Sequence, residues 1–178
     1  MIHLVLGGAR SGKSRFALQQ VKQLSEQTDL PVIFVATATA SDPEMAQRIA
    51  YHEAERPDNW RVAEVPMDLN LLLAETEFLP KQILLIDCLT LWLNNQIFEY
   101  PDQNFKILFS ELLDGLNACK CDIFLVSNEV GLGIIPMGEV SRTFVEQAGW
   151  LNQALAASVD KVTFTAAGLP MTLKDTSQ

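Results

Sequence analysis

Residues 7–14 have the types and spacing of a phosphate-binding site. Their sequence, Gly-Gly-Ala-Arg-Ser-Gly-Lys-Ser, fits the pattern G-x-x-x-x-G-K-[ST], whose backbone N–H groups surround phosphates. The lysine of this pattern reaches the β- and γ-phosphates, and the final hydroxyl ligates Mg²⁺. A chance glycine turn is the alternative, but an apolar run before the loop and a helical pattern after it favour a functional loop. The pattern predicts triphosphate contacts from Gly7, Gly8, Ala9, Arg10, Ser11, Gly12, Lys13 and Ser14.

A second group of residues could act on phosphorus. If residues 43–56 form a helix, Arg48, His52 and Arg56 follow one another at four-residue spacing on one face. Two guanidinium groups disfavour the imidazolium form of His52 and keep a neutral ring nitrogen available for attack. That arrangement suits phosphoramidate chemistry. A solvated amphipathic helix with alternating charge is the alternative, because Glu53 and Glu55 are nearby.

Carboxylates end two of the expected strands. The apolar run 83–86 leads to Asp87, which is the Walker-B pattern, in which an aspartate positions Mg²⁺ together with Ser14. A cap for the following helix is the alternative role of Asp87. Glu64 ends the run 60–64 and suits a guanine edge or a ribose hydroxyl, although a surface charge is equally compatible.

Two loops follow other strands. Small residues at 36–40, Ala-Thr-Ala-Thr-Ala, could contact a nucleotide or form a plain connection. Residues 127–133, Ser-Asn-Glu-Val-Gly-Leu-Gly, could close over a substrate or form a structural turn, since both glycines give the backbone freedom. The second histidine, His3, lies in the first expected strand and is predicted to be a core residue.

Apolar runs rich in Val, Ile and Leu alternate with amphipathic helical patterns along the chain. This alternation predicts the α/β class, with a mostly parallel sheet covered by helices on both faces. Ligands bind beyond the carboxyl ends of the strands in such sheets. We expect one domain over residues 1–174 and a frayed polar tail at 175–178. Strands are expected at 2–6, 32–36, 60–64, 83–87, 123–127, 161–166 and 171–173, and helices at 13–26, 43–56, 69–77, 89–98, 104–118 and 139–158.

Composition narrows the functional classes. The chain is 48% hydrophobic and 20% charged, which is typical of a soluble globular protein, and no apolar run reaches the ~18 residues of a membrane span. The net charge of −9 and the absence of a basic cluster argue against nucleic-acid binding. Three cysteines, two of them spaced too tightly for a C-x-x-C motif, favour reduced thiols in a cytoplasmic protein without a signal peptide.

Three segments together resemble one known family over nearly the whole chain. They are Gly-Gly-Ala-Arg-Ser-Gly-Lys-Ser at 7–14, Arg48-Ile49-x-x-His52-x-x-x-Arg56-Pro57-x-x-Trp60, and Asn128-Glu129-Val130-Gly131-x-Gly133-Ile134-x-Pro136. Their order resembles the bifunctional adenosylcobinamide kinase / adenosylcobinamide-phosphate guanylyltransferases of cobalamin biosynthesis. The resemblance implies a RecA-like P-loop fold of three layers. It also implies a trimer whose sites lie near the subunit interfaces.

The resemblance implies two reactions. A γ-phosphoryl passes from ATP or GTP to the hydroxyl of adenosylcobinamide, and GMP from GTP then gives adenosyl-GDP-cobinamide and pyrophosphate. His52 corresponds to the histidine that carries GMP, and Arg56 or Arg48 would stabilise the transferring group, so the expected catalytic residues are His52, Lys13 and Arg56. Nucleotide contacts carried over from the family, besides 7–14, are Ala36, Thr37, Ala38, Glu53, Ala54, Glu55, Arg56, Glu64 and Asp87, with Ser14 and Asp87 holding Mg²⁺.

Two other interpretations remain open. Another small-molecule P-loop kinase would transfer phosphoryl groups without forming a GMP adduct. A RecA-like ATPase module would act on nucleic acid or on a partner, hydrolyse nucleotide and need no corrinoid. The acidic charge and the absent basic patch argue against its nucleic-acid version. A GTP-dependent switch is disfavoured, because the N-K-x-D signature for guanine is absent.

Overall fold

A seven-stranded sheet organises the part of the chain that the computed structural model describes, residues 1–38, 56–76 and 81–176. The strand order is β3-β2-β4-β5-β1-β6-β7, and every neighbouring pair is parallel except β6 with β7. The strands are β1 (Ile2–Gly7), β2 (Val32–Ala36), β3 (Arg61–Glu64), β4 (Ile83–Asp87), β5 (Asp122–Asn128), β6 (Lys161–Ala166) and β7 (Leu169–Asp175).

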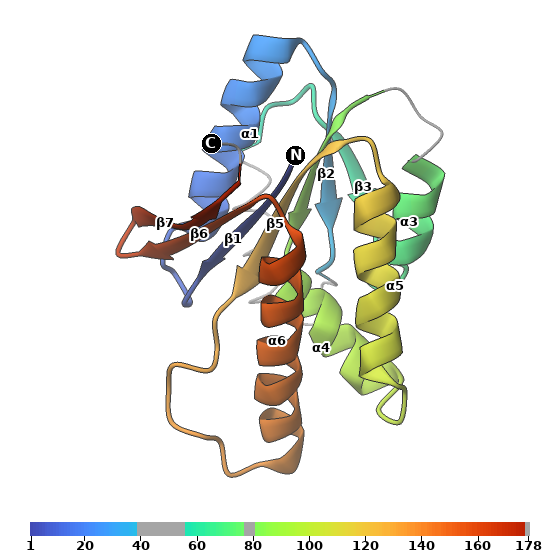
Figure 1. Cartoon of the computed structure of the whole chain (residues 1–178), viewed down its shortest axis with the longest axis vertical. Coiled ribbons are helices and arrows are strands. Elements are labelled where there is room, and N and C mark those ends of the chain that lie inside the picture. Colours follow the sequence, from blue (N-terminus) through green and yellow to red (C-terminus); the bar gives the residue numbers. More distant parts are fainter. Residues whose placement is uncertain (39–55, 77–80, 177–178) are drawn as a thin grey trace.

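Helices cover both faces of the sheet (Figure 1). Helix α1 packs on one face, and α3 to α6 lie on the other, which gives the predicted three-layer α/β architecture. The described helices are α1 (Lys13–Thr28), α3 (Leu69–Thr76), α4 (Leu89–Glu99), α5 (Phe105–Ala118) and α6 (Glu139–Ser158). The expected helix at 43–56 lies outside the described residues, apart from Arg56 at its end.

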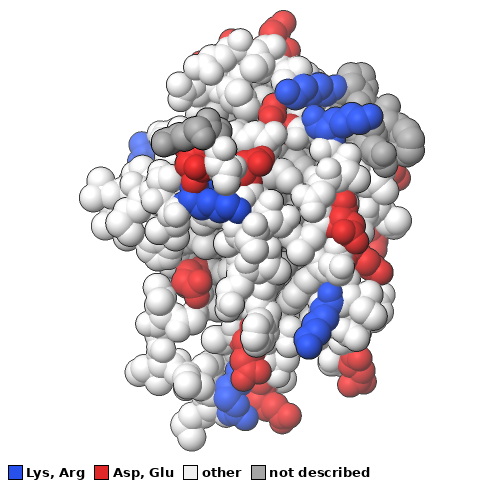
Figure 2. All heavy atoms as spheres, in the orientation of Figure 1, with Lys and Arg blue, Asp and Glu red and all other residues white. Residues whose placement is uncertain are grey.

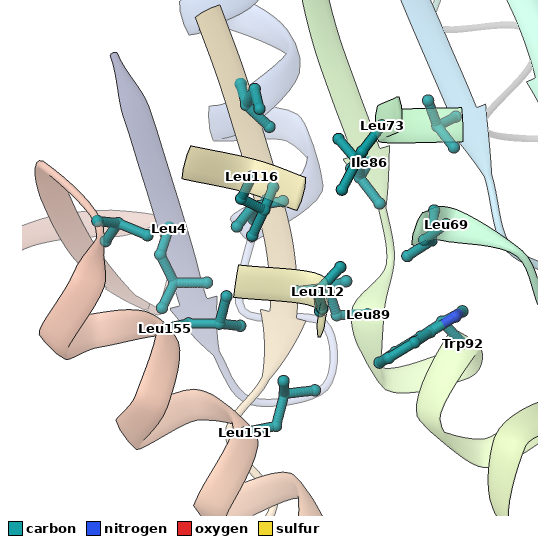
Figure 3. Packing of buried hydrophobic residues seen from close by; sticks show 14 of the residues in the cluster. Leu4, Leu69, Leu73, Ile86, Leu89, Trp92, Leu112, Leu116, Leu151 and Leu155 are labelled. Atoms are coloured by element: carbon teal, nitrogen blue, oxygen red, sulfur yellow. The ribbon is translucent and has the colours of Figure 1, made fainter. Parts of the chain in front are cut away.

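Strand residues alternate between two apolar clusters because successive side chains point to opposite faces. In β1, Leu4 and Leu6 join the cluster under α3 to α6, whereas Val5 joins the cluster under α1. In β4, Leu84 and Ile86 alternate with Ile83 and Leu85 in the same way. Figure 3 shows helix residues of the larger cluster, including Trp92 and Leu112, pointing toward the sheet. Burial on both faces explains why these strands lack polar alternation.

The last strand differs from its prediction. We expected a short strand at 171–173 and a frayed tail from residue 175, but β7 runs antiparallel to β6 through Asp175. A two-residue turn with positive φ at Ala167 and Gly168 forms the hairpin. Asp175 also makes an ion pair with Lys161 at 3.1 Å, and these long-range contacts order the end of the strand.

His3 lies in the core, as predicted. It is 1% exposed, its Nε2 is 2.8 Å from the Thr163 hydroxyl, and its ring contacts Phe16 and Phe124. Burial, and to a lesser extent the Lys161 ammonium, lower the pKa of His3 from 6.5 to about 4. The ring is therefore neutral at physiological pH.

The buried imidazole predicts an acid-sensitive fold. The unfolded chain binds a proton at His3 below about pH 6.5 and the folded chain only near pH 4, so folding stability falls as the pH drops between these values. We expect His3 to account for a loss on the order of 3 kcal/mol below pH 4. Denaturant unfolding at pH 7 and pH 4.5 should show a smaller pH effect in His3→Gln than in the wild type. Equal pH effects in the two proteins would contradict the lowered pKa.

Candidate nucleotide-binding site

The predicted phosphate-binding loop connects β1 to α1. Strand β1 ends at Gly7, α1 begins at Lys13, and Arg10 and Gly12 have positive φ between them. Gly12 has no side chain that could cap α1, so the first N–H groups of the helix face the loop with the positive end of the helix dipole. This geometry suits an anion, as the sequence predicted.

Lys13 is held inside the loop. Its side chain is only 9% exposed, and Nζ donates a hydrogen bond to the carbonyl of Gly8 at 3.1 Å. The ammonium is therefore shielded from solvent at the position where phosphates are expected. Its low exposure strengthens its attraction for an anion, because water screens the charge less.

Gly7 is packed so closely that a side chain cannot fit. A Cβ there would lie 2.4 Å from Ser11 Oγ, 2.5 Å from Thr165 Oγ1 and 2.6 Å from the Thr165 carbonyl oxygen. A Cβ on the adjacent Gly8 would meet nothing within 4 Å. The two neighbouring glycines therefore differ in what they require of the fold.

This difference predicts unequal effects of two alanine substitutions. Gly7→Ala should lower the free energy of unfolding by at least about 2 kcal/mol, because the backbone of β6 has to shift. Gly8→Ala should change it by less than about 0.5 kcal/mol. Denaturant unfolding without nucleotide measures both values, and equal destabilisation by the two substitutions would contradict the packing.

Asp87 ends β4 on the face that carries the loop. The strand register places it in one row with Ala36 of β2 and Val126 of β5, and Val126 packs under α1. Burial, followed by the Asp87 carboxylate, raises the pKa of the Cys88 thiol to about 11, whereas Lys13 acts in the opposite direction. In the sheet, β5 alone separates the strand that ends at Asp87 from β1, the strand that leads into the loop.

Thr37 has a structural role that was not predicted from the sequence. It is fully buried, and its hydroxyl donates to the Cys88 carbonyl at 2.7 Å and accepts from the Cys88 N–H at 2.9 Å. Asn95 of α4 in turn donates to the carbonyls of Thr37 and Pro66, both at 3.0 Å. These bonds fix the end of β2 against the residue that follows Asp87. The polar run Asn94-Asn95-Gln96 within an apolar helix was the sequence feature that could have predicted these hydrogen bonds.

Hydrogen bonds hold the segment after β5 beside the phosphate-binding loop. The N–H of Glu129 donates to the Gly7 carbonyl at 3.0 Å, and the N–H of Asn128 donates to the Thr90 hydroxyl at 2.7 Å. Asn152 of α6 donates to the Asn128 carbonyl at 3.1 Å and contacts the Ser127 hydroxyl at 2.8 Å. The start of the predicted 127–133 loop is therefore structurally fixed, and only its continuation is exposed.

Two residues that are predicted to contact the nucleotide lie away from the phosphate-binding loop. Glu64 is exposed on β3, four strands from β1, which corresponds to about 19 Å at the usual strand spacing. The Arg56 guanidinium lies 4.3 Å above the centroid of the Phe34 ring on β2, a cation–π contact about three strands from β1. A ligand that contacts the loop and Glu64 together has to extend along the carboxyl edge of the sheet.

The other predicted site residues lie either near the end of a described range or outside the described residues. Ala36 ends β2 and Ala38 follows Thr37, both half-buried at the carboxyl edge. Arg48, His52, Glu53, Ala54 and Glu55 lie outside the described residues.

The described side chains could hold a metal ion only together with phosphate oxygens of a bound nucleotide. The described residues contain no group of three or more His, Cys, Asp and Glu side chains that could hold an ion. Ser14 and Asp87 offer one hydroxyl and one carboxylate, which fits Mg²⁺ bound mainly through a triphosphate.

Surface charge agrees with a small anionic ligand. The Lys and Arg residues in Figure 2 are scattered among Asp and Glu and form no continuous basic face in that view. Within the described ranges, no helix is long and apolar enough to cross a membrane.

The fold and loop define a P-loop nucleotide-binding protein of the RecA-like class. One solved structure of an ATPase domain has the same architecture, with a TM-score of 0.54 and 14% identity over 92% of this chain and 68% of that chain. The family model described as cobinamide kinase / cobinamide phosphate guanyltransferase matches residues 3–173, and the chain belongs to this family.

Two relatives are similar over nearly their whole length. The bifunctional adenosylcobalamin biosynthesis protein CobP of Pseudomonas aeruginosa is 48% identical over 174 residues, covering 98% of each chain. The bifunctional adenosylcobalamin biosynthesis protein CobU of Escherichia coli is 34% identical and covers 98% of this chain and 100% of the relative.

Proposed function

We propose that this protein phosphorylates adenosylcobinamide and then transfers GMP to the resulting phosphate. The observation that carries the proposal is family membership over residues 3–173, joined to the strand–loop–helix arrangement of residues 7–14. We further propose that a single domain, residues 1–174, performs both reactions, because the described strands form one sheet.

In the kinase step the substrate hydroxyl attacks the γ-phosphorus of ATP or GTP. A new O–P bond forms, the bond to the β-phosphate oxygen breaks, and the hydroxyl proton is released. Residues 7–14 hold the triphosphate, and Lys13 stabilises the charge that develops on the phosphates. Mg²⁺, held by Ser14 and Asp87, would neutralise further negative charge.

In the guanylyl step His52 attacks the α-phosphorus of GTP, and pyrophosphate leaves. The phosphate of the corrinoid then attacks the GMP–histidine bond and regenerates the imidazole. Two transfers let the large corrinoid enter after pyrophosphate has gone. We propose that Arg56, or Arg48, stabilises the transferring group. In this structure the Arg56 guanidinium lies over the Phe34 ring.

The remaining nucleotide contacts are proposals from the family resemblance. Ala36 and Ala38 would contact the nucleotide at the end of β2, and Thr37 through its backbone, since its hydroxyl already bonds to Cys88. Glu64 would bind guanine or ribose at the far end of an extended GTP. Glu53, Ala54 and Glu55 complete the proposed set.

Product analysis tests the function directly. Purified protein, cobinamide, Mg²⁺ and ATP should yield cobinamide phosphate by mass spectrometry, and GTP should convert that phosphate to GDP-cobinamide with release of pyrophosphate. Phosphorylation without guanylyl transfer would favour a simple P-loop kinase. Slow hydrolysis that ignores cobinamide would favour an ATPase module.

We also propose a cytoplasmic homotrimer. Cys88, Cys119 and Cys121 form no disulfide in the described structure, which is consistent with a reducing compartment. Exposed apolar side chains gather after β5, where Leu132, Ile134, Ile135 and Met137 are at least 76% exposed, and such a patch favours assembly. Light scattering should give a mass near three times 19.8 kDa, and a monomer mass would refute the trimer.

A further inference from the structure

The β6–β7 hairpin holds the phosphate-binding loop from outside the motif. Thr165 of β6 is paired in register with Gly7, the last residue of β1. Its hydroxyl lies 2.9 Å from Ser11 Oγ and donates to the Leu6 carbonyl at 3.2 Å. Because the threonine proton points to Leu6, the Ser11 hydroxyl donates to Thr165. Both side chains are buried, with exposures of 8% for Ser11 and 1% for Thr165.

The turn of the hairpin makes a second contact with the same residue. The N–H of Gly168 donates to the Ser11 carbonyl at 2.9 Å. A Cβ on Gly12 would lie 3.1 Å from the Gly168 Cα, so the turn touches the loop. Ser11 is thus fixed at its hydroxyl and at its carbonyl by residues more than 150 positions later in the chain.

Fixing the Ser11 carbonyl also orients a donor. The carbonyl of Ser11 and the N–H of Gly12 belong to one peptide plane and point in opposite directions when the bond is trans. Since the carbonyl points to Gly168, the Gly12 N–H points away from the hairpin. Backbone N–H groups of this loop are the ones expected to bind phosphate.

We propose that Thr165 and the Gly168 turn are positioning elements that hold the loop in its phosphate-binding shape before nucleotide arrives. The inference rests on the proposed binding of a triphosphate at 7–14. A binding site that is ordered in advance loses less entropy on binding, so loss of these bonds weakens nucleotide affinity without removing any contact to the nucleotide. Neither residue lies in the 7–14 motif.

Thr165→Val tests the proposal, because valine keeps the shape of threonine and loses the hydroxyl. We expect the dissociation constant for Mg·GTP, measured by calorimetry without corrinoid, to rise about tenfold, the equivalent of one lost hydrogen bond. In steady state the KM for nucleotide should rise more than kcat falls. Thr165→Ser should restore affinity.

Thr163→Val is the matched control. Thr163 lies on the same strand with the same 1% exposure, but its hydroxyl bonds to His3 instead of the loop. We expect it to lower stability as Thr165→Val does, and to leave the GTP dissociation constant within about twofold. Equal weakening of GTP binding by both variants would attribute the effect to general destabilisation and overturn the proposal.

A double-mutant cycle with Ser11→Ala gives a second measurement if Thr165→Val folds poorly at the assay temperature. Ser11→Ala alone should weaken GTP binding, and the double variant should weaken it no more than Thr165→Val does, because Thr165→Val already breaks the bond between the two hydroxyls. Additive effects would refute the coupling. A wild-type protein that binds no GTP would refute the nucleotide site itself, whereas unchanged binding in Thr165→Val would refute the positioning role alone.

Discussion

Replacing His52 with asparagine is expected to abolish covalent attachment of GMP to the protein. Incubation with GTP labelled in the α-phosphate should label the wild type with an adduct that is acid-labile and base-stable, as a phosphoramidate is. Asparagine has no nucleophilic ring nitrogen, so the variant should retain no label and form no GDP-cobinamide. His52 is the residue that separates this proposal from an ordinary P-loop kinase.

The chain provides its own control for this experiment, because it contains only two histidines. His3 is buried against Thr163 and two phenylalanine rings, so His3→Gln should keep the adduct. His52→Asn should also retain phosphorylation of cobinamide, since that step needs no covalent histidine. A labelled His52→Asn protein would exclude His52 as the nucleophile.

Lys13→Ala is expected to reduce the phosphorylation of cobinamide by at least about 10²-fold, the scale observed when one charge-stabilising donor is removed. Lys13 is 9% exposed and its ammonium donates to the Gly8 carbonyl within the loop, where alanine cannot replace its charge. Transfer of label from γ-labelled ATP to cobinamide measures the effect. If one loop serves both reactions, formation of the GMP adduct should fall as well.

Lys22→Ala is the matched control for Lys13→Ala. Lys22 lies on the same helix α1 but is exposed, away from the loop. We expect its variant to keep the wild-type rate of phosphorylation. Retained kinase activity in Lys13→Ala would remove the loop from the mechanism, and a loss only of the adduct would assign the loop to the guanylyl step alone.

The elements were predictable because their signals are local. The bounds of β2, β4, β6 and α6 are those expected from the apolar patterns and their flanking residues. The β7 strand was underestimated because its order comes from distant partners, such as the ion pair of Asp175 with Lys161. A four-residue polar tail gives no local signal for such a contact.

The site could be predicted only where one segment carries the chemistry. The 7–14 motif contains its own glycines, lysine and hydroxyl in consecutive positions, and the structure gives it the expected strand–loop–helix context. Thr37 was expected to contact nucleotide, and that contact stays a proposal; the structure shows that its hydroxyl bonds to the Cys88 peptide. Threonine after a strand is compatible with either role, and the partner that decides lies 51 positions away.

The sequence by itself determined the phosphate-binding loop, the α/β class and the family, since all three depend on residues close together in the chain or on their order. Tertiary structure alone decided which strands are neighbours. The order β3-β2-β4-β5-β1-β6-β7 places Asp87 two strands and Glu64 four strands from the loop, and it brings Thr165 onto Ser11. Strand pairing depends on backbone hydrogen bonds between distant segments, which no local pattern encodes.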